Sequence, residues 1–157
     1  MATIRIVWPH GALTATLRGT PTADRLISSL PLESRAETWG DEVYFRVPFS
    51  ARAEPDASDV VAKSAICFWL DGDSIALLFG PTPVSRGGEC RLISAANIVG
   101  MIDGDAALLR SVDSVPGLTE RVETRRDMCW ESFSSTRSMA SSASCSKRRW
   151  LACRPAQ

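Results

Sequence analysis

Two short apolar segments place the strongest constraint on how this chain folds. They read SAICFWL, residues 64–70, and SIALLFG, residues 74–80, and Asp-Gly-Asp joins them. Near-continuous apolar runs of this length are typical of strands that are covered on both faces, and Asp-Gly-Asp is typical of a turn. The sequence therefore predicts a central hairpin that is buried on both sides.

Alternating apolar and polar residues predict further strands on either side of this hairpin. Residues 3–8 (TIRIVW) and 12–19 (ALTATLRG) alternate and are joined by Pro-His-Gly, which predicts a hairpin. Residues 35–50 (RAETWGDEVYFRVPFS) predict a second hairpin with a tight connection at Gly40-Asp41. Neighbouring strand residues point to opposite faces. We therefore expect Phe45 in the core and Tyr44 on the other face.

The remaining segments predict one helix, a long loop and two more strands. Thr22 is the expected N-cap of the helix, and Pro31 is its expected end. A Pro/Gly-rich loop is expected over residues 80–95. Strands are expected at residues 96–104 and 117–125, with a short helix at residues 105–112 between them. This pattern is typical of a mainly β protein, a β-barrel with one or two short helices.

Composition limits the classes of function. The formal net charge is zero, so no overall field favours nucleic acid or a membrane surface. No apolar run approaches the ~20 residues of a membrane-spanning helix, and no secretory signal is evident. The five cysteines include no Cys-x-x-Cys pair, and the usual metal ligands are missing. We expect a cytoplasmic protein without a metal or cofactor; its oligomeric state stays open.

The C-terminal part differs from the rest in composition. Residues 126–157 hold six basic and two acidic side chains, against 12 and 16 in residues 1–125. They are rich in Ser, Arg and Cys and have neither helical nor strand periodicity. We expect a domain at 1–125 and a disordered or loosely attached extension at 126–157. An out-of-frame end and a basic tail that binds an acidic partner are the alternatives.

Three segments also resemble a known family. They read TWGDEVYFRVP (38–48), AICFWLDGDSIALLFGPTPVS (65–85) and ANIVGMIDGD (96–105). In order and spacing they are similar to the signature segments of a small bacterial and archaeal cyclophilin-like family. The resemblance covers roughly residues 2 to 125 and implies a closed barrel of about eight strands, but no established activity. Here Phe68 and Leu70 stand where the family usually has Tyr and Pro.

Residues with catalytic chemistry are few. His10 is the only histidine and lies in an expected turn, so a Ser-His-Asp or Cys-His arrangement has no other base. Cys67 is expected to be a buried apolar residue. Cys90, in the expected loop, is expected to be exposed and oxidisable. Turn formation explains Asp71 and Asp73 better than acid–base chemistry does.

An aromatic cleft is the expected site. We expect it between the Trp-Gly turn, the aromatic strand and the long loop, with Arg46 binding a carbonyl or carboxylate. Its expected residues are Trp39, Tyr44, Arg46, Trp69, Thr82, Arg86 and Arg91. Three functions stay open: binding of a small molecule or peptide, a weak or atypical peptidyl-prolyl isomerase, and an interaction protein without a pocket. Packing of Tyr44 under a helix or loop is the alternative to the cleft.

Overall fold

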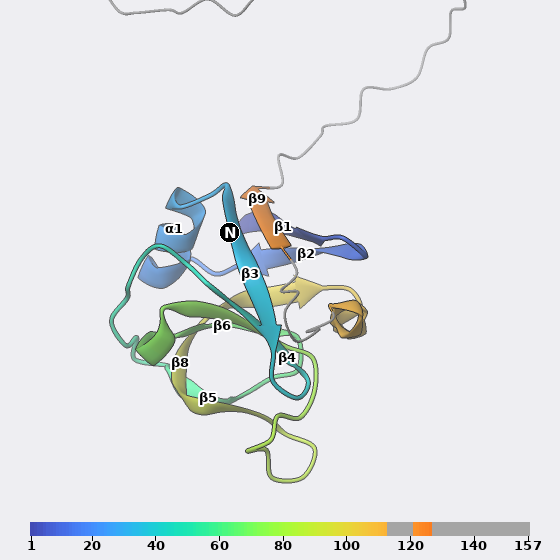
Figure 1. Ribbon diagram of the computed structural model, residues 1–157. Coiled ribbons are helices and arrows are strands. Elements are labelled where there is room, and N and C mark those ends of the chain that lie inside the picture. Colours follow the sequence, from blue (N-terminus) through green and yellow to red (C-terminus); the bar gives the residue numbers. More distant parts are fainter. Residues whose placement is uncertain (113–120, 127–157) are drawn as a thin grey trace, which may run out of the picture.

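The computed structural model describes residues 1–112 and the backbone of residues 121–126, and it is mainly β (Figure 1). The mainly β class with short helices is therefore confirmed. The strands are β1 Ala2–Trp8, β2 Gly11–Leu17, β3 Leu32–Thr38, β4 Glu42–Arg46, β5 Ser58–Val61, β6 Ala65–Trp69, β7 Ser74–Leu78, β8 Cys90–Asp103 and β9 Arg121–Arg126. The helical elements are α1 Pro21–Ser28 and the short 3-10 helices η1 Leu70–Gly72 and η2 Ala106–Ser111.

The central hairpin, β6 and β7, is buried on both faces, as its apolar sequence predicts. One face belongs to the larger core cluster and carries large side chains: Ile66, Phe68, Ile75 and Leu77. The other face belongs to a second cluster and carries mainly smaller ones: Ala65, Cys67, Ala76 and Leu78. The hairpin therefore separates two apolar layers of different side-chain size.

All nine strands of the described residues pair antiparallel in one sheet. The order is β2-β1-β9-β3-β4-β7-β6-β8-β5, and β8 also pairs with β2. The expected closed barrel of about eight strands is confirmed only as a mainly β, antiparallel sheet, in which, among the described strands, β5 pairs with β8 alone. β8 pairs with β2 over four residue pairs, from Thr14↔Asp103 to Leu17↔Gly100, and the earlier part of β8 pairs with β5. Figure 1 shows β8 curving along this path.

The first hairpin and its alternation are confirmed. Ile4, Ile6 and Trp8 of β1 are buried, and β1 pairs with β2 along its whole length. The predicted N-cap of the helix, Thr22, is wrong, because it lies two residues after the observed one. The Thr20 side chain accepts a hydrogen bond from the Ala23 amide at 3.3 Å and is the N-cap of α1.

Thr22 serves a different purpose from the expected cap. Its hydroxyl and amide both donate to Oε1 of Glu54, at 2.7 and 2.9 Å. The buried Asn97 side chain donates to the Thr22 hydroxyl at 2.9 Å and accepts from the Glu54 amide at 2.8 Å. This network ties α1 and the segment before β5 to β8.

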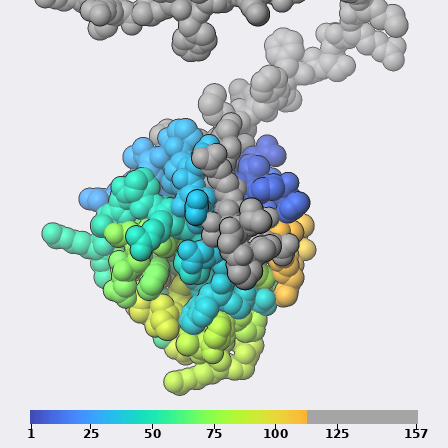
Figure 2. Space-filling model, viewed as in Figure 1, coloured from blue at the N-terminus to red at the C-terminus, as the bar shows by residue number. Residues whose placement is uncertain are grey.

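The expected loop at residues 80–95 is shorter than predicted. It ends at Glu89, because β8 begins at Cys90 and pairs with β5, a strand that sequence analysis missed. The expectation that Cys90 is exposed is wrong. It is 4% exposed and packs in the second cluster, and burial raises the pKa of its thiol. Figure 2 shows the end of the molecule formed by the loop of residues 80–89.

The boundary at residue 125 and the extension at 126–157 stay predictions, because residues 113–120 and 127–157 lie outside the described residues. The short helix expected at residues 105–112 is confirmed as η2. The expected last strand is confirmed in β9, which lies between β1 and β3.

A pair of substitutions in β4 tests the assignment of its two faces. Phe45 is 1% exposed in the larger cluster, whereas Tyr44 is half-buried on the opposite face. We expect Phe45→Ala to lower the free energy of unfolding by ~3–5 kcal/mol, the usual cost of a large aromatic truncation in a core. Tyr44→Ala is the matched control and should cost clearly less in urea unfolding. Equal costs would contradict the assignment.

Two truncations test where the domain ends. Removal of residues 127–157 leaves every strand pairing of the described residues in place, so we expect the melting temperature to stay within a few degrees. Removal of residues 121–157 deletes β9. Since β9 alone joins β1 to β3 in the sheet order, cooperative unfolding should be lost. Loss of cooperative unfolding on removal of residues 127–157 alone would show that the extension packs on the domain.

Candidate functional site

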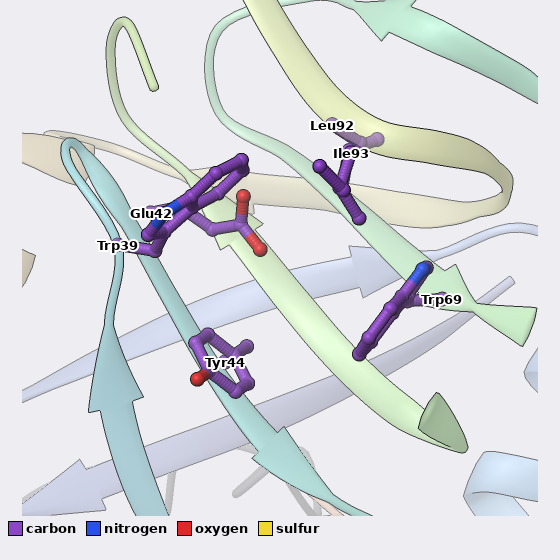
Figure 3. Close-up of a pocket in the computed structure, with 6 residues that line it drawn as sticks. All are labelled: Trp39, Glu42, Tyr44, Trp69, Leu92 and Ile93. Carbon is purple, nitrogen blue, oxygen red and sulfur yellow. The ribbon is translucent and has the colours of Figure 1, made fainter. Parts of the chain in front are cut away.

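A hollow of about 220 Å³ opens on the side of the second cluster. Figure 3 shows its lining: the carboxyl group of Glu42 lies between the rings of Trp39 and Trp69, with Tyr44 beside them and two apolar residues of β8 across the opening. The lining residues are Trp39, Glu42, Tyr44, Trp69, Leu92 and Ile93. Three aromatic rings, two aliphatic side chains and one carboxyl group therefore meet in one place.

The Trp-Gly turn places Trp39 at the rim. The Trp39 amide donates to the Glu42 carbonyl at 2.9 Å, which closes the turn between β3 and β4. Gly40 has a φ of +64°, and a Cβ there would lie 2.9 Å from the Pro83 ring and 3.0 Å from the Pro81 carbonyl oxygen. Only glycine accepts both this conformation and this close approach. The loop of residues 80–89 thus positions the turn from outside.

Glu42 and Tyr44 reach the hollow because they are two residues apart on β4 and share a face. Tyr44 pairs with Ala76 of β7, and Ala76 pairs with Cys67 of β6. These small neighbours leave room in front of the ring. The Tyr44 hydroxyl donates to Oε2 of Glu37 at 2.6 Å, which fixes the ring's outer end.

The turn after β6 fixes Trp69. Its indole N–H donates to the Ser94 hydroxyl at 2.9 Å, and that hydroxyl donates to Asp71 at 2.8 Å. A Cβ on Gly72 would lie 2.1 Å from the Trp69 ring. The Asp-Gly-Asp sequence therefore forms the hairpin turn and also provides the surface on which this ring rests.

Glu42 is the unusual group in the hollow. It is only 6% exposed, and its Oε2 has no hydrogen-bond partner among the described residues. Burial disfavours the charged form and raises the pKa of the carboxyl from 4.5 to about 7. Near neutral pH the group is therefore divided between its acid and its carboxylate.

Two other titratable side chains near Glu42, Tyr44 and Cys67, stay neutral at this pH. The hydrogen bond to Glu37, followed by burial, raises the pKa of Tyr44 to about 12. Burial is the main cause that raises the pKa of Cys67 to about 12, with the charge of Glu42 adding to it. Cys67 is buried, as the sequence predicts. Of these three groups, only Glu42 titrates in the neutral range.

The structure brings three of the seven expected site residues together: Trp39, Tyr44 and Trp69. Arg46 lies in a neighbouring hollow of about 210 Å³, which also includes Arg35 and shares Tyr44 and Trp69 with the first. Among the described side chains, the lining of the first hollow carries a carboxyl group and no arginine. Its charge is thus opposite to the one that a carboxylate ligand requires.

Thr82, Arg86 and Arg91 are not among the lining residues of either hollow. Thr82 is buried and donates from its hydroxyl to the Arg91 carbonyl. The Arg91 guanidinium pairs with Asp59 and with Glu89, the latter at 2.7 Å. Arg86 is exposed, and its amide donates to Glu89 at 3.0 Å. Apart from the exposed Arg86 side chain, these groups hold the loop and the start of β8 together.

Sequence reasoning missed Glu42, Leu92 and Ile93. A signal for Glu42 was present, because it precedes Tyr44 by two residues in a segment of strict alternation. No such signal existed for Leu92 and Ile93, which fell within the predicted loop. No group of three or more His, Cys, Asp or Glu that could hold a metal occurs in the described residues. No helix there is long and apolar enough to cross a membrane.

Comparison with known proteins identifies the family. The Cyclophilin-like family model matches residues 2–119, so the chain belongs to the cyclophilin-like family. The family resemblance noted in the sequence is thereby confirmed. No curated protein matches the chain in sequence.

Two solved structures are similar to this one. The solution structure of the hypothetical protein AF2241 from Archaeoglobus fulgidus has 27% identity and a TM-score of 0.64, over 80% of this chain and 95% of that one. A structure of McbB in complex with tryptophan has 18% identity and a TM-score of 0.58, over 84% of this chain. This chain covers 46% of McbB, and at that identity the likeness concerns the fold alone.

The raised pKa of Glu42 predicts a pH-dependent stability. The folded protein keeps the proton until about pH 7, whereas the unfolded chain releases it near 4.5. The stabilisation is therefore complete below pH 4.5 and is lost as the pH rises through 7. Relative to Glu42→Gln, the free energy of unfolding of the wild type should fall by about 2.5 kcal/mol between pH 5 and 8, since a tenfold change in proton affinity corresponds to about 1.4 kcal/mol.

Urea unfolding of both proteins at several pH values measures this difference. Other titrating groups are common to the two proteins and cancel. A difference that does not change between pH 5 and 8 would show that Glu42 titrates as an exposed carboxyl does.

Proposed function

We propose that this protein binds a small, largely apolar molecule in the hollow between Trp39 and Trp69, and that Glu42 contacts the ligand's polar group. The observation that carries the proposal is the buried carboxyl oxygen of Glu42, which lies among aromatic side chains and has no hydrogen-bond partner in the part of the chain that the structure describes. Buried polar groups are nearly always hydrogen-bonded. A buried polar group that is not hydrogen-bonded and borders an open hollow can accept a hydrogen bond from a ligand or donate one to it.

The composition of the lining supports the same function. Ligand sites are mostly apolar and aromatic, with a few placed polar groups that fix orientation. The rings here are held from behind, Tyr44 by Glu37 and Trp69 by Ser94. Such anchoring lowers the entropy cost of binding, because the side chains are ordered before the ligand arrives.

The size of the hollow favours a small molecule over a peptide. Its volume of about 220 Å³ is below the ~300–1,000 Å³ of sites for drug-sized ligands. A prolyl isomerase needs an arginine at the hollow that holds the proline ring. Arg46 does not line the hollow between Trp39 and Trp69 but lies in the neighbouring one. The family fold also occurs in a protein solved with a small ligand, McbB with tryptophan.

NMR detection of the tryptophan indole N–H groups tests the proposal. We expect a set of small neutral, cationic and anionic molecules to contain members that shift the Trp39 and Trp69 signals, which Trp39→Phe and Trp69→Phe identify. Trp69→Ala should weaken such binding about tenfold or more, because it removes one aromatic wall. Arg86→Ala, at an exposed position outside the lining, is the control and should leave it unchanged.

Two results would count against small-molecule binding. If no member of the set shifts either indole signal in the folded protein, the result favours the hypothesis of an interaction protein without a pocket. If a proline peptide shifts them and its isomerisation is accelerated, the isomerase reading replaces ours.

A further inference from the structure

We propose that the ligand of this hollow is an organic cation, an ammonium group with apolar substituents that sits between the aromatic rings and the Glu42 carboxylate. This inference rests on the proposed function and gives the chemical class of the ligand. Its basis is the combination of a buried carboxyl group, whose Oε2 has no partner among the described residues, and three aromatic rings near it.

The charge of the lining favours a cation. Two other carboxylates near turns of this sheet form ion pairs: Asp41 pairs with Arg110 at 3.0 Å, and Glu89 pairs with Arg91 at 2.7 Å. Glu42 forms no ion pair within the described residues. A buried carboxylate is costly without a counter-charge, so a cation in the hollow stabilises the ionised form that the empty hollow disfavours.

The aromatic rings select the same kind of ligand. The face of an indole or phenol ring attracts a cation within about 6 Å of its centre, and Trp does so best. Figure 3 shows Trp39 and Trp69 on two sides of the Glu42 carboxyl group, with Tyr44 nearby. A cation in this space contacts the carboxylate and the rings at once.

The lining does not suit a metal cation. A metal ion such as Ca²⁺ needs six to eight oxygen ligands, and the lining side chains supply the Glu42 carboxylate and the Tyr44 hydroxyl, which is already bonded to Glu37. Leu92 and Ile93 complete the wall with aliphatic groups. An alkylated ammonium group, which is apolar at its surface and carries a diffuse charge, fits this mixture.

Two probes of the same shape separate charge from fit. Choline carries a trimethylammonium group, and 3,3-dimethyl-1-butanol carries a neutral tert-butyl group in its place. By the Trp39 and Trp69 indole signals at pH 8, we expect choline to bind at least about tenfold more tightly. Glu42→Gln should clearly reduce this preference to the part that the aromatic rings provide, and should leave the affinity for the alcohol within about twofold. Asp56→Asn removes an exposed carboxylate outside the lining and should retain the preference.

The pH dependence in the wild type gives a second readout. Choline keeps its charge at every pH, and of Glu42, Tyr44 and Cys67 only Glu42 titrates near neutral pH. Choline affinity should fall about tenfold from pH 8 to pH 6, as the carboxylate fraction falls, while the alcohol's affinity stays constant. This pH dependence tests the cation inference even if Glu42→Gln does not fold.

The outcomes separate the two proposals. Equal affinity of the wild type for both probes overturns the cation inference and leaves small-molecule binding in place. A preference for choline that Glu42→Gln does not reduce has the same consequence, because the Glu42 carboxylate then does not contact the cation. Binding of neither probe to the folded protein overturns the cation inference, and the wider set of molecules described above then decides small-molecule binding by itself.

Discussion

The β6–β7 hairpin has to be buried on both faces, and the rest of the structure is arranged around that constraint. Its larger side chains, with Phe68 and Leu77 fully buried, face the main cluster, where each such residue contributes about 1.5–3 kcal/mol by leaving water. The smaller ones face the second cluster, which β5 and β8 cover. The long β8 serves both layers, because it pairs with β6 along one edge and with β2 and β5 along the other.

The candidate site follows from the unequal size of the two faces. Small residues such as Ala76 and Cys67 leave space in front of Tyr44, and two glycine turns bring large rings to the edges of that space. Gly40 lets the turn of Trp39 pack on the loop after β7, and Gly72 lets the Trp69 ring lie on its own turn. Glu42 then carries the cost of a carboxyl group in an apolar surrounding. Such a cost at an open hollow is typical of a site that a ligand completes.

Local patterns predicted most of the elements but little of the polar chemistry. Alternation placed Phe45 and Tyr44 on opposite faces, and continuous apolar runs identified the central hairpin. These signals are local, because they depend on the period of a strand. Thr22 and Cys90 were misjudged because their environment depends on partners far along the chain, Glu54 and Asn97 for one and β5 for the other. Trp39, Tyr44 and Trp69 were found as aromatic residues of distinctive segments, whereas Glu42 was not singled out.

The central claim is that Glu42 is a buried carboxyl group that lacks a hydrogen-bond partner among the described residues and borders an aromatic hollow. The most direct measurement is the pKa of that single side chain, from the ¹³C chemical shift of its carboxyl carbon followed over pH, with Glu42→Gln assigning the signal. Our account predicts a midpoint of about 7 in the ligand-free protein. A midpoint near 4.5 would contradict it, because it would mean that the carboxylate is solvated or paired, and the hollow would lose the group on which its proposed function depends.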